Sequence, residues 1–203
     1  MILGVTGGIA SGKSTVTKLL AQQGAEVVSA DQLSRELVEP GSAVLAQLVA
    51  CFGEGILDGE GRLNRAALGA RVFADAVARK QLEAIMHPAI AVLSRQRLHE
   101  AQQRAALVVY EAPLLYEAHA EDRVDRVLTV TVDPAVQLAR LLARDRCSEQ
   151  EARNRIGAQM PQEEKARRAD YVLDNSSDLM RLKDRVDAFY RQLAADIIVA
   201  DRS

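Results

Sequence analysis

The sequence contains few aromatic residues and no tryptophan, and it lacks the features that mark several large classes of protein. Aromatic side chains make up only 3% of its 203 residues. No run approaches the roughly 18 consecutive apolar residues of a membrane span, and no basic segment precedes a cleavable apolar one near the first residue. We therefore expect no membrane partner and a cytoplasmic location.

The sequence also has only two cysteines and no large excess of positive or negative charge. Cys51 and Cys147 are far apart and belong to no C-x-x-C or Cys/His pattern, so the sequence supports neither a zinc site nor a disulfide framework. The 26 basic and 28 acidic residues give a net charge of −2. Because nucleic acids attract strongly basic surfaces, we expect no nucleic-acid partner.

A glycine-rich motif stands near the start of the chain. Residues 7–14 read Gly-Gly-Ile-Ala-Ser-Gly-Lys-Ser, which fits the pattern G-x-x-x-x-G-K-[ST] at every fixed position. Glycines let backbone N–H groups face phosphate oxygens, Lys13 places a positive charge near the β- and γ-phosphates, and the Ser14 hydroxyl can hold Mg²⁺. The motif therefore predicts a site for a nucleoside triphosphate and Mg²⁺.

Short apolar runs alternate with helical patterns, which predicts an α/β fold of the P-loop NTPase type, a doubly wound parallel sheet of about five strands. Residues 32–104 interrupt this alternation with helical patterns and no convincing strand, so we expect an inserted helical lobe. A chain of this length favours one domain. The expected strands are Ile2 to Thr6, Glu26 to Ser29, Leu107 to Tyr110, Val127 to Val132 and Tyr171 to Leu173.

Three acidic residues follow predicted strands, where sheets of this kind bind ligands. Asp31 could accept the proton of an attacking hydroxyl or help position Mg²⁺, or it could cap a helix that starts at Gln32. Glu111 and Asp133 are each candidates for the acidic partner of the metal. Pro134 makes helix capping a sufficient account of Asp133, whereas Glu111 stays open.

Arg140 and Arg144 are four residues apart on a predicted helix, so they share a face and could converge on one polyphosphate. The alternative is a solvated basic face paired with Asp145 and Glu149.

A histidine interrupts the helical patterns of the inserted lobe. His87 separates the pattern of residues 79–86 from that of residues 90–103, and it precedes Pro88. From the residues alone, a structural role at a helix break is favoured over a chemical one.

The order of these motifs resembles that of the dephospho-CoA kinase family, which transfers the γ-phosphate of ATP to the 3′-hydroxyl of the dephospho-CoA ribose. The resemblance spans nearly the whole chain and is most specific at residues 113–117, Pro-Leu-Leu-Tyr-Glu, and 169–175, Ala-Asp-Tyr-Val-Leu-Asp-Asn. The other matching segments are 6–15, 30–31, 37–41, 52–53, 63–65, 87–88, 137–144 and 155–160.

The resemblance implies a single kinase domain that binds ATP, dephospho-CoA and Mg²⁺. We expect a monomer, although the sequence leaves an oligomer open. Its parts would be a core (1–31, 105–140 and 169–203), an acceptor-binding lobe (32–104) and a lid (141–168). It implies that Asp31 is the general base, that Lys13 and Arg140 act on the transferred group and that Ser14 holds the metal. The implied ATP contacts are Ala10, Ser11, Gly12, Lys13, Ser14, Thr15, Arg144 and Asn175, and the implied acceptor contacts are Asp31, Arg65, His87, Pro113, Leu114 and Glu117.

Two positions depart from the family's usual pattern. Ser29 stands where the family has the first acid of Asp-Ala-Asp, and Ser177 stands where glycine is common. Loss of the first acid would weaken Mg²⁺ binding if that acid contributes to the metal's water contacts.

Two rival functions fit the residues less well. One is a kinase for another small acceptor, such as a nucleoside or a sugar. The other is a nucleotide-dependent switch without phosphoryl transfer, although the chain has no Asn-Lys-x-Asp motif for reading guanine.

Overall fold

The computed structural model describes the backbone of residues 1–200 and all side chains in that range except those of residue 73 and residues 196–200. The last three residues of the predicted core therefore lie outside the described part. The chain divides into two compact units. One contains Met1–Ser29 and the chain from Leu98 onward, and the other contains Ala30–Arg97.

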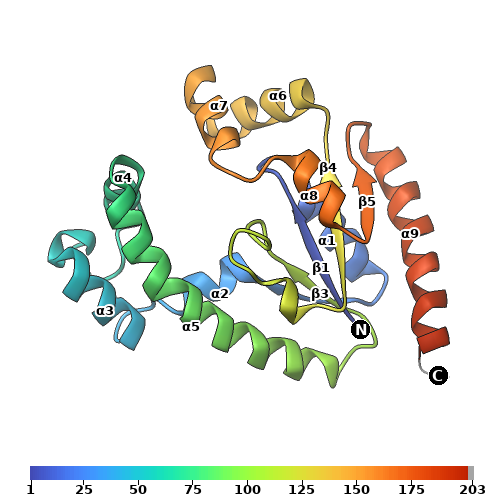
Figure 1. Ribbon diagram of the computed structural model, residues 1–203, viewed down its shortest axis with the longest axis horizontal. Helices are drawn as coiled ribbons and strands as arrows, with labels where there is room; N and C mark the ends of the chain where they lie inside the picture. Colours follow the sequence, from blue (N-terminus) through green and yellow to red (C-terminus); the bar gives the residue numbers. More distant parts are fainter. Residues whose placement is uncertain (201–203) are drawn as a thin grey trace. The chain divides into compact units, whose positions relative to one another are not determined.

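A parallel sheet of five strands forms the centre of the first unit, which confirms the predicted fold class (Figure 1). Its strand order is β2-β3-β1-β4-β5. The runs are almost continuously apolar because helices cover both faces of such a sheet. The strands are β1 (Ile2–Gly7), β2 (Glu26–Ser29), β3 (Val108–Glu111), β4 (Arg126–Thr131) and β5 (Tyr171–Asp174).

The register places the ends of the inner strands at one edge of the sheet. Val5 of β1 and Ser29 of β2 both pair with Glu111 of β3, while Gly7 pairs with Val130 of β4. The neighbours of β1 are β3 on one side and β4 on the other, so the connections diverge at its carboxyl end and leave a crevice there. The glycine-rich motif begins in this crevice.

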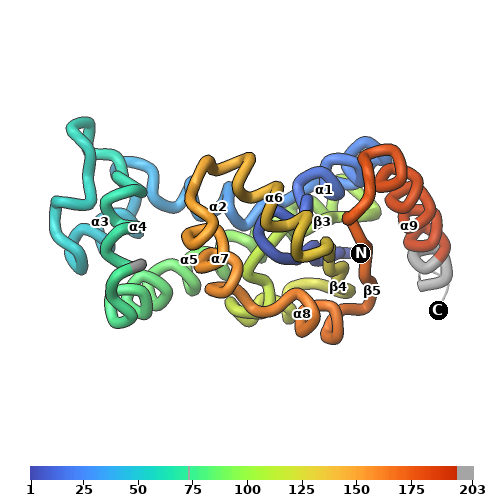
Figure 2. The backbone as a smooth tube through the Cα atoms, turned by 90° about the horizontal axis from the view of Figure 1, so that it is seen from above, coloured from blue at the N-terminus to red at the C-terminus, as the bar shows by residue number. Residues whose placement is uncertain are grey.

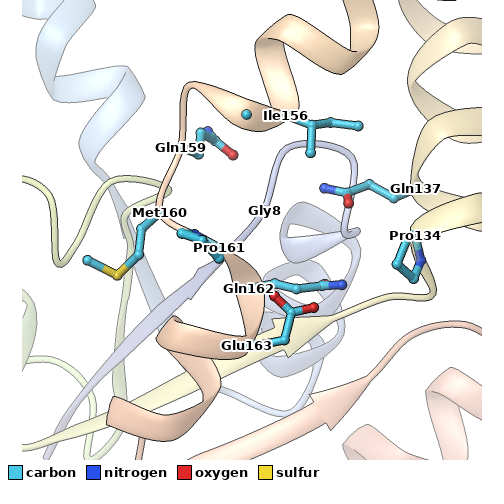
Figure 3. A pocket seen from close by; sticks show the side chains of 10 residues that line it. Gly8, Pro134, Gln137, Ile156, Gln159, Met160, Pro161, Gln162 and Glu163 are labelled. Carbon is cyan, nitrogen blue, oxygen red and sulfur yellow. The ribbon is translucent and has the colours of Figure 1, made fainter.

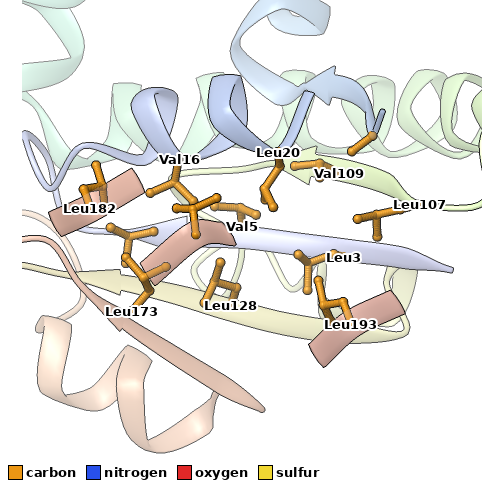
Figure 4. Packing of buried hydrophobic residues seen from close by; sticks show 13 residues of the cluster. Leu3, Val5, Val16, Leu20, Leu107, Val109, Leu128, Leu173, Leu182 and Leu193 are labelled. Carbon is orange, nitrogen blue, oxygen red and sulfur yellow. The ribbon is translucent and has the colours of Figure 1, made fainter. Parts of the chain in front are cut away.

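Two helices cover one face of the sheet and form its main hydrophobic core (Figure 4). They are α1 (Lys13–Gln22), directly after the glycine-rich loop, and α9 (Leu179–Ala200) near the end of the chain. The short helix α8 (Gln162–Arg168) lies on the opposite face (Figure 2). The fully buried members of the core are Leu3, Val5, Val16, Leu20, Val109, Leu128, Val130, Val186 and Leu193.

The segment between β4 and β5 is helical, and it contains the predicted lid. Helix α6 (Pro134–Asp145) runs without a break across the predicted boundary between core and lid, and α7 (Glu149–Gly157) follows it. Ser148 and Glu151 form the reciprocal capping bonds that open α7, as the sequence pattern predicts.

The second unit is helical, with a hydrophobic core of its own. It holds α2 (Ala30–Glu36), α3 (Ala43–Phe52), the 3₁₀ turn η1 (Glu54–Ile56), α4 (Arg65–Ala74) and much of α5 (Ala76–Gln102). The side chains of Ser42 and Asn64 cap α3 and α4. The buried core residues are Val38, Leu45, Leu48, Phe52, Ile56, Leu68 and Ala78.

The predicted helix break at His87 and Pro88 is wrong, because helix α5 continues through both residues. The structure shows one helix of 27 residues with Pro88 inside it. A proline within a helix removes one N–H donor, which leaves the carbonyl of Ala84 without its usual helical partner, but packing of the flanking turns can override this local preference. Leu82, Ile85 and Met86 pack on the core of the second unit just before the proline.

Within residues 1–200, no helix combines the length and the apolar character that crossing a bilayer requires.

Candidate active site

The glycine-rich loop joins the end of β1 to the start of α1 and folds into a compact turn. Ala10 and Gly12 have left-handed φ angles of 58° and 88°. The Ser11 N–H donates to the Gly8 carbonyl at 3.2 Å. Lys13 is buried, and its Nζ donates to the carbonyls of Gly7 and Gly8 at 2.9 and 2.8 Å. The ammonium therefore lies across the loop, at the N-terminal end of α1, where helices favour anions.

Gly12 sits where no larger residue fits. A Cβ atom at this position would lie 2.1 Å from Asn175 Nδ2, and the φ of 88° is itself strained for any other residue. Asn175 is buried, and its Nδ2 donates to the Ser11 carbonyl at 2.8 Å. The end of β5 therefore packs directly against the loop.

Replacing Gly12 with alanine is expected to destabilise the protein by about 1–3 kcal/mol, the range for one strained backbone position, and to displace Asn175 from the loop. Chemical denaturation and ATP titration would measure both effects. Gly69→Ala is the control, because Gly69 lies within α4 with open space around it and alanine favours helix. Equal stability of the two variants would contradict the described packing.

Two arginines of α6 have different surroundings. Arg140 Nη1 donates to the Asn175 carbonyl at 2.9 Å, so its guanidinium lies next to the segment that supports the loop. Arg144 instead pairs with Asp145, at 2.7 Å, which raises the pKa of Arg144 and lowers that of Asp145. The ion-paired alternative thus describes Arg144 in this structure, and its contact with ATP stays a prediction.

The metal side of the site is formed by the first turn of α1 and the end of β3. Ser14 is exposed at the second position of α1. One turn later, Thr17 Oγ1 lies 3.1 Å from Glu111 Oε2 and 3.2 Å from the Ser14 carbonyl. Asp133, the other candidate, accepts from the N–H groups of Ala135 and Val136 and so caps α6, as Pro134 indicates.

The described residues contain no group of three or more His, Cys, Asp or Glu side chains that could hold a metal ion by themselves. Mg²⁺ usually binds through one or two protein oxygens together with water and substrate phosphates. The exposed Ser14 hydroxyl fits this mode of binding, and the Glu111 carboxylate is linked to the same turn of α1 through Thr17.

The segment after β3 is held by an ion pair that the sequence analysis did not anticipate. Lys165 of α8 is fully buried, and its Nζ lies 2.8 Å from Glu117 Oε1 and 2.7 Å from the Pro113 carbonyl. Burial lowers the pKa of Lys165, and the hydrogen bond that its ammonium donates to Glu117 opposes this shift. Glu117 Oε1 also accepts from the Met160 N–H at 3.0 Å.

These bonds engage both oxygens of Glu117 within the protein. Leu114 is 45% exposed, and the ring of Pro113 is partly exposed, so both present surface to a ligand. The predicted acceptor contacts of Pro113 and Leu114 remain compatible with the structure. For Glu117, a positioning role is the simpler interpretation.

Three predicted site residues belong to the second unit. Asp31 is exposed in the first turn of α2, which begins at Ala30, so the predicted cap of a helix starting at Gln32 is wrong. The helix begins two residues earlier than predicted, because β2 leads into it without a loop. Arg65 is exposed at the start of α4, and His87 is partly buried in α5.

A cavity of about 300 Å³ lies beside the phosphate loop within the first unit (Figure 3). The residues that line it come from the loop at Gly8, from the start of α6 at Pro134 and Gln137, and from the stretch that runs from the end of α7 to the start of α8, namely residues 156–157 and 159–163. Sequence reasoning assigned no role to Gln137 or Gln159, although both lie in segments that match the family.

A parallel sheet of this order with a G-x-x-x-x-G-K-[ST] loop between β1 and α1 defines a P-loop protein of the nucleotide-dependent kinase type. A profile of the family described as dephospho-CoA kinase matches residues 1–181. The chain belongs to the dephospho-CoA kinase family. This membership confirms the expected enzyme class, an ATP-dependent kinase of coenzyme A biosynthesis.

Relatives cover almost the entire chain. The dephospho-CoA kinase of Syntrophotalea carbinolica is 50% identical over 194 residues, which is 95% of this chain and 92% of that protein. A crystal structure from Thermus thermophilus matches with a TM-score of 0.81 and 37% identity, covering 95% of this chain and 97% of that one. Dephospho-CoA kinase from Campylobacter jejuni matches with a TM-score of 0.71 and 25% identity, covering 96% and 98%.

Proposed function

We propose that this protein, in the cytoplasm and as a monomer, transfers the γ-phosphate of ATP to the 3′-hydroxyl of dephospho-CoA, giving CoA and ADP. The observation that carries the proposal is the folded phosphate loop, with Lys13 across it, in a chain of this family. The new bond joins the ribose oxygen to the γ-phosphorus, while the bond to the β–γ bridging oxygen breaks and ADP leaves with its electrons.

On the nucleotide side, backbone N–H groups of residues 10–15 bind the phosphates, and the Ser11 N–H exchanges its bond to the Gly8 carbonyl for a phosphate oxygen. Lys13 exchanges its loop carbonyls for phosphate oxygens, and Arg140 adds a second positive charge from α6. Ser14 holds Mg²⁺, which offsets negative charge on the phosphates when it is bound. Arg144 and Asn175 complete the contacts to ATP, with Asn175 on the adenine side.

On the acceptor side, Asp31 accepts the proton of the 3′-hydroxyl as that oxygen attacks. Its contribution comes from being positioned next to the hydroxyl that it deprotonates. The residues Arg65, His87, Pro113, Leu114 and Glu117 support acceptor binding, either by direct contact or through the segments to which they belong.

A coupled assay of ADP release tests this proposal. ADP release is expected with dephospho-CoA and to be far slower without an acceptor, because kinases of this type suppress hydrolysis by excluding water. The product should be identified as CoA by mass, and chelation of Mg²⁺ should stop the reaction. Faster turnover with a nucleoside or a sugar would indicate another acceptor. ATP turnover indifferent to every acceptor would indicate a regulatory ATPase instead.

A further inference from the structure

Two glutamine side chains hold the same residue of the phosphate loop. Gln137 Nε2, from α6, donates to the Ile9 carbonyl at 2.8 Å. Gln159 Oε1, from the segment after α7, accepts from the Ile9 N–H at 2.7 Å. Figure 3 shows the two side chains on different sides of the loop. Because one partner is a carbonyl and the other an N–H group, the orientation of each amide is dictated by its bond.

These two bonds fix the two peptide groups that flank Ile9. In a planar trans peptide the C=O and the following N–H point in opposite directions. When Gln137 holds the Ile9 carbonyl, it therefore also sets the direction of the Ala10 N–H. Ala10 has a left-handed φ of 58°, an uncommon conformation for alanine that needs support from its surroundings.

The other peptide group is held on both sides. Its carbonyl, on Gly8, accepts from Lys13 Nζ at 2.8 Å and from the Ser11 N–H at 3.2 Å. Its N–H, on Ile9, donates to Gln159. A Cβ atom on Gly8 would lie 2.7 Å from Gln137 Nε2, so the close approach of that glutamine depends on glycine at this position.

The two glutamines differ in what supports them. Gln137 is 5% exposed and lies in the first turns of α6, next to the cap formed by Asp133. Gln159 is partly exposed and belongs to the predicted lid. Its neighbour Met160 is bonded to Glu117 through its N–H group, so the position of Gln159 is tied to the segment after β3.

We propose that Gln137 and Gln159 are positioning residues for phosphoryl transfer. Gln137 aims the Ala10 N–H into the phosphate cradle, and Gln159 makes the geometry of the loop depend on the placement of the predicted lid. The inference rests on the proposed function only in that the loop binds the triphosphate of ATP. If the loop adopts its phosphate-binding conformation only when the predicted lid is in place, ATP hydrolysis by water would be slow whenever the lid is displaced.

The alternative is that these bonds only stabilise the fold. Replacing each glutamine by glutamate distinguishes the two roles, because a carboxylate accepts hydrogen bonds but does not donate them. Gln159→Glu keeps the acceptor for the Ile9 N–H. Gln137→Glu removes the donor and sets a negative charge against the Ile9 carbonyl. Both variants add the same charge near the loop, so the difference between them reports the direction of the hydrogen bond.

The experiment measures kcat, the KM values for ATP and dephospho-CoA, acceptor-independent ATP hydrolysis and the melting temperature, at a pH where the new carboxyls are ionised. Gln137→Glu is expected to lower kcat by about 10- to 100-fold, as misplacement of reacting groups does. The kcat of Gln159→Glu should stay several-fold closer to that of the parent protein. Gln159→Met has no hydrogen-bond acceptor for the Ile9 N–H, so it should raise the ratio of ATP hydrolysis to phosphoryl transfer. Gln137→Met replaces the glutamate variant if that variant fails to fold.

Gln150→Glu is the matched control, because Gln150 is exposed on α7, where its Nε2 donates to Asn154 Oδ1 at 3.0 Å. It should behave as the parent protein does. Equal kcat values for the two glutamate variants, or losses that follow melting temperature alone, would overturn the inference. A parent protein without acceptor-dependent ADP release would instead refute the proposed function, and the ATP affinities of the same variants would still test the positioning of the loop.

Discussion

Asp31→Asn should lower kcat roughly 100-fold or more, because asparagine cannot accept the proton of the 3′-hydroxyl and removal of a general base has effects of this size. ATP affinity should change little, since the phosphate contacts come from the loop and α1. Asparagine has nearly the same shape and can occupy the first turn of α2, so stability should also be retained. Steady-state kinetics and titration with a non-hydrolysable ATP analogue would measure these effects.

Glu39→Gln is a suitable control for this experiment, since it neutralises an exposed acid a short distance after α2. It should leave kcat close to that of the parent protein. If Asp31→Asn retained near-normal turnover, the proton would have to leave by another route, and Asp31 would not be the base. A loss of ATP binding equal to the loss of kcat would place Asp31 with the nucleotide or its metal instead.

The second large effect is expected at the buried ion pair between Glu117 and Lys165. Glu117→Ala leaves the fully buried ammonium of Lys165 without its carboxylate, and breaking a buried pair in this way destabilises proteins by several kcal/mol. We expect about 3 kcal/mol, at the lower end of that range, because the Glu117 side chain is 24% exposed. Chemical denaturation at neutral pH would measure the change in the free energy of unfolding.

Lys165→Met should destabilise the protein less than Glu117→Ala does, since water can reach the carboxylate that it leaves behind.

The destabilisation caused by Glu117→Ala should shrink as the pH rises. Burial lowers the pKa of Lys165, and removing Glu117 takes away the carboxylate that opposes that shift. Between this lowered pKa and the ordinary value of lysine, the unfolded chain binds more protons than the folded chain, so stability increases with pH.

Arg167→Met is the control for these variants, because Arg167 lies on the same helix with its side chain 74% exposed. Its stability should match that of the parent protein. If Lys165→Met proved more destabilising than Glu117→Ala, the bond from Lys165 to the Pro113 carbonyl would matter more than the charge pair.

The sheet could be predicted because its signal is local. Each of the five strands is a short apolar run bounded by turn residues, and the observed strands differ from the expected ones by a residue or so at their ends. The position of the phosphate loop follows from the same pattern, since the motif lies between a strand and an amphipathic helix. Asp133 as a cap of α6 likewise depends only on adjacent residues.

Features that depend on distant contacts could not be predicted. The course of α5 through Pro88 depends on the packing of its flanking turns, whereas the sequence shows only the local preference of proline for a break. In the sequence, Lys165 is one of several positive charges in a basic stretch, and only the structure shows that it is buried beside Glu117. Gln137 and Gln159 carry no chemical signature, and their importance appears only when both reach Ile9 from opposite ends of the 134–161 segment.

The absence of a loop between β2 and α2 has a mechanical consequence. Ser29 is fixed in the sheet by pairing with Glu111, and Asp31 follows only two residues later. Two residues span at most about 7 Å of chain, so the backbone itself keeps the Cα atom of Asp31 within that distance of Ser29. Substitutions in the inserted lobe beyond α2 leave this short connection unchanged, so we expect them to alter acceptor binding without lengthening the chain between the proposed base and β2.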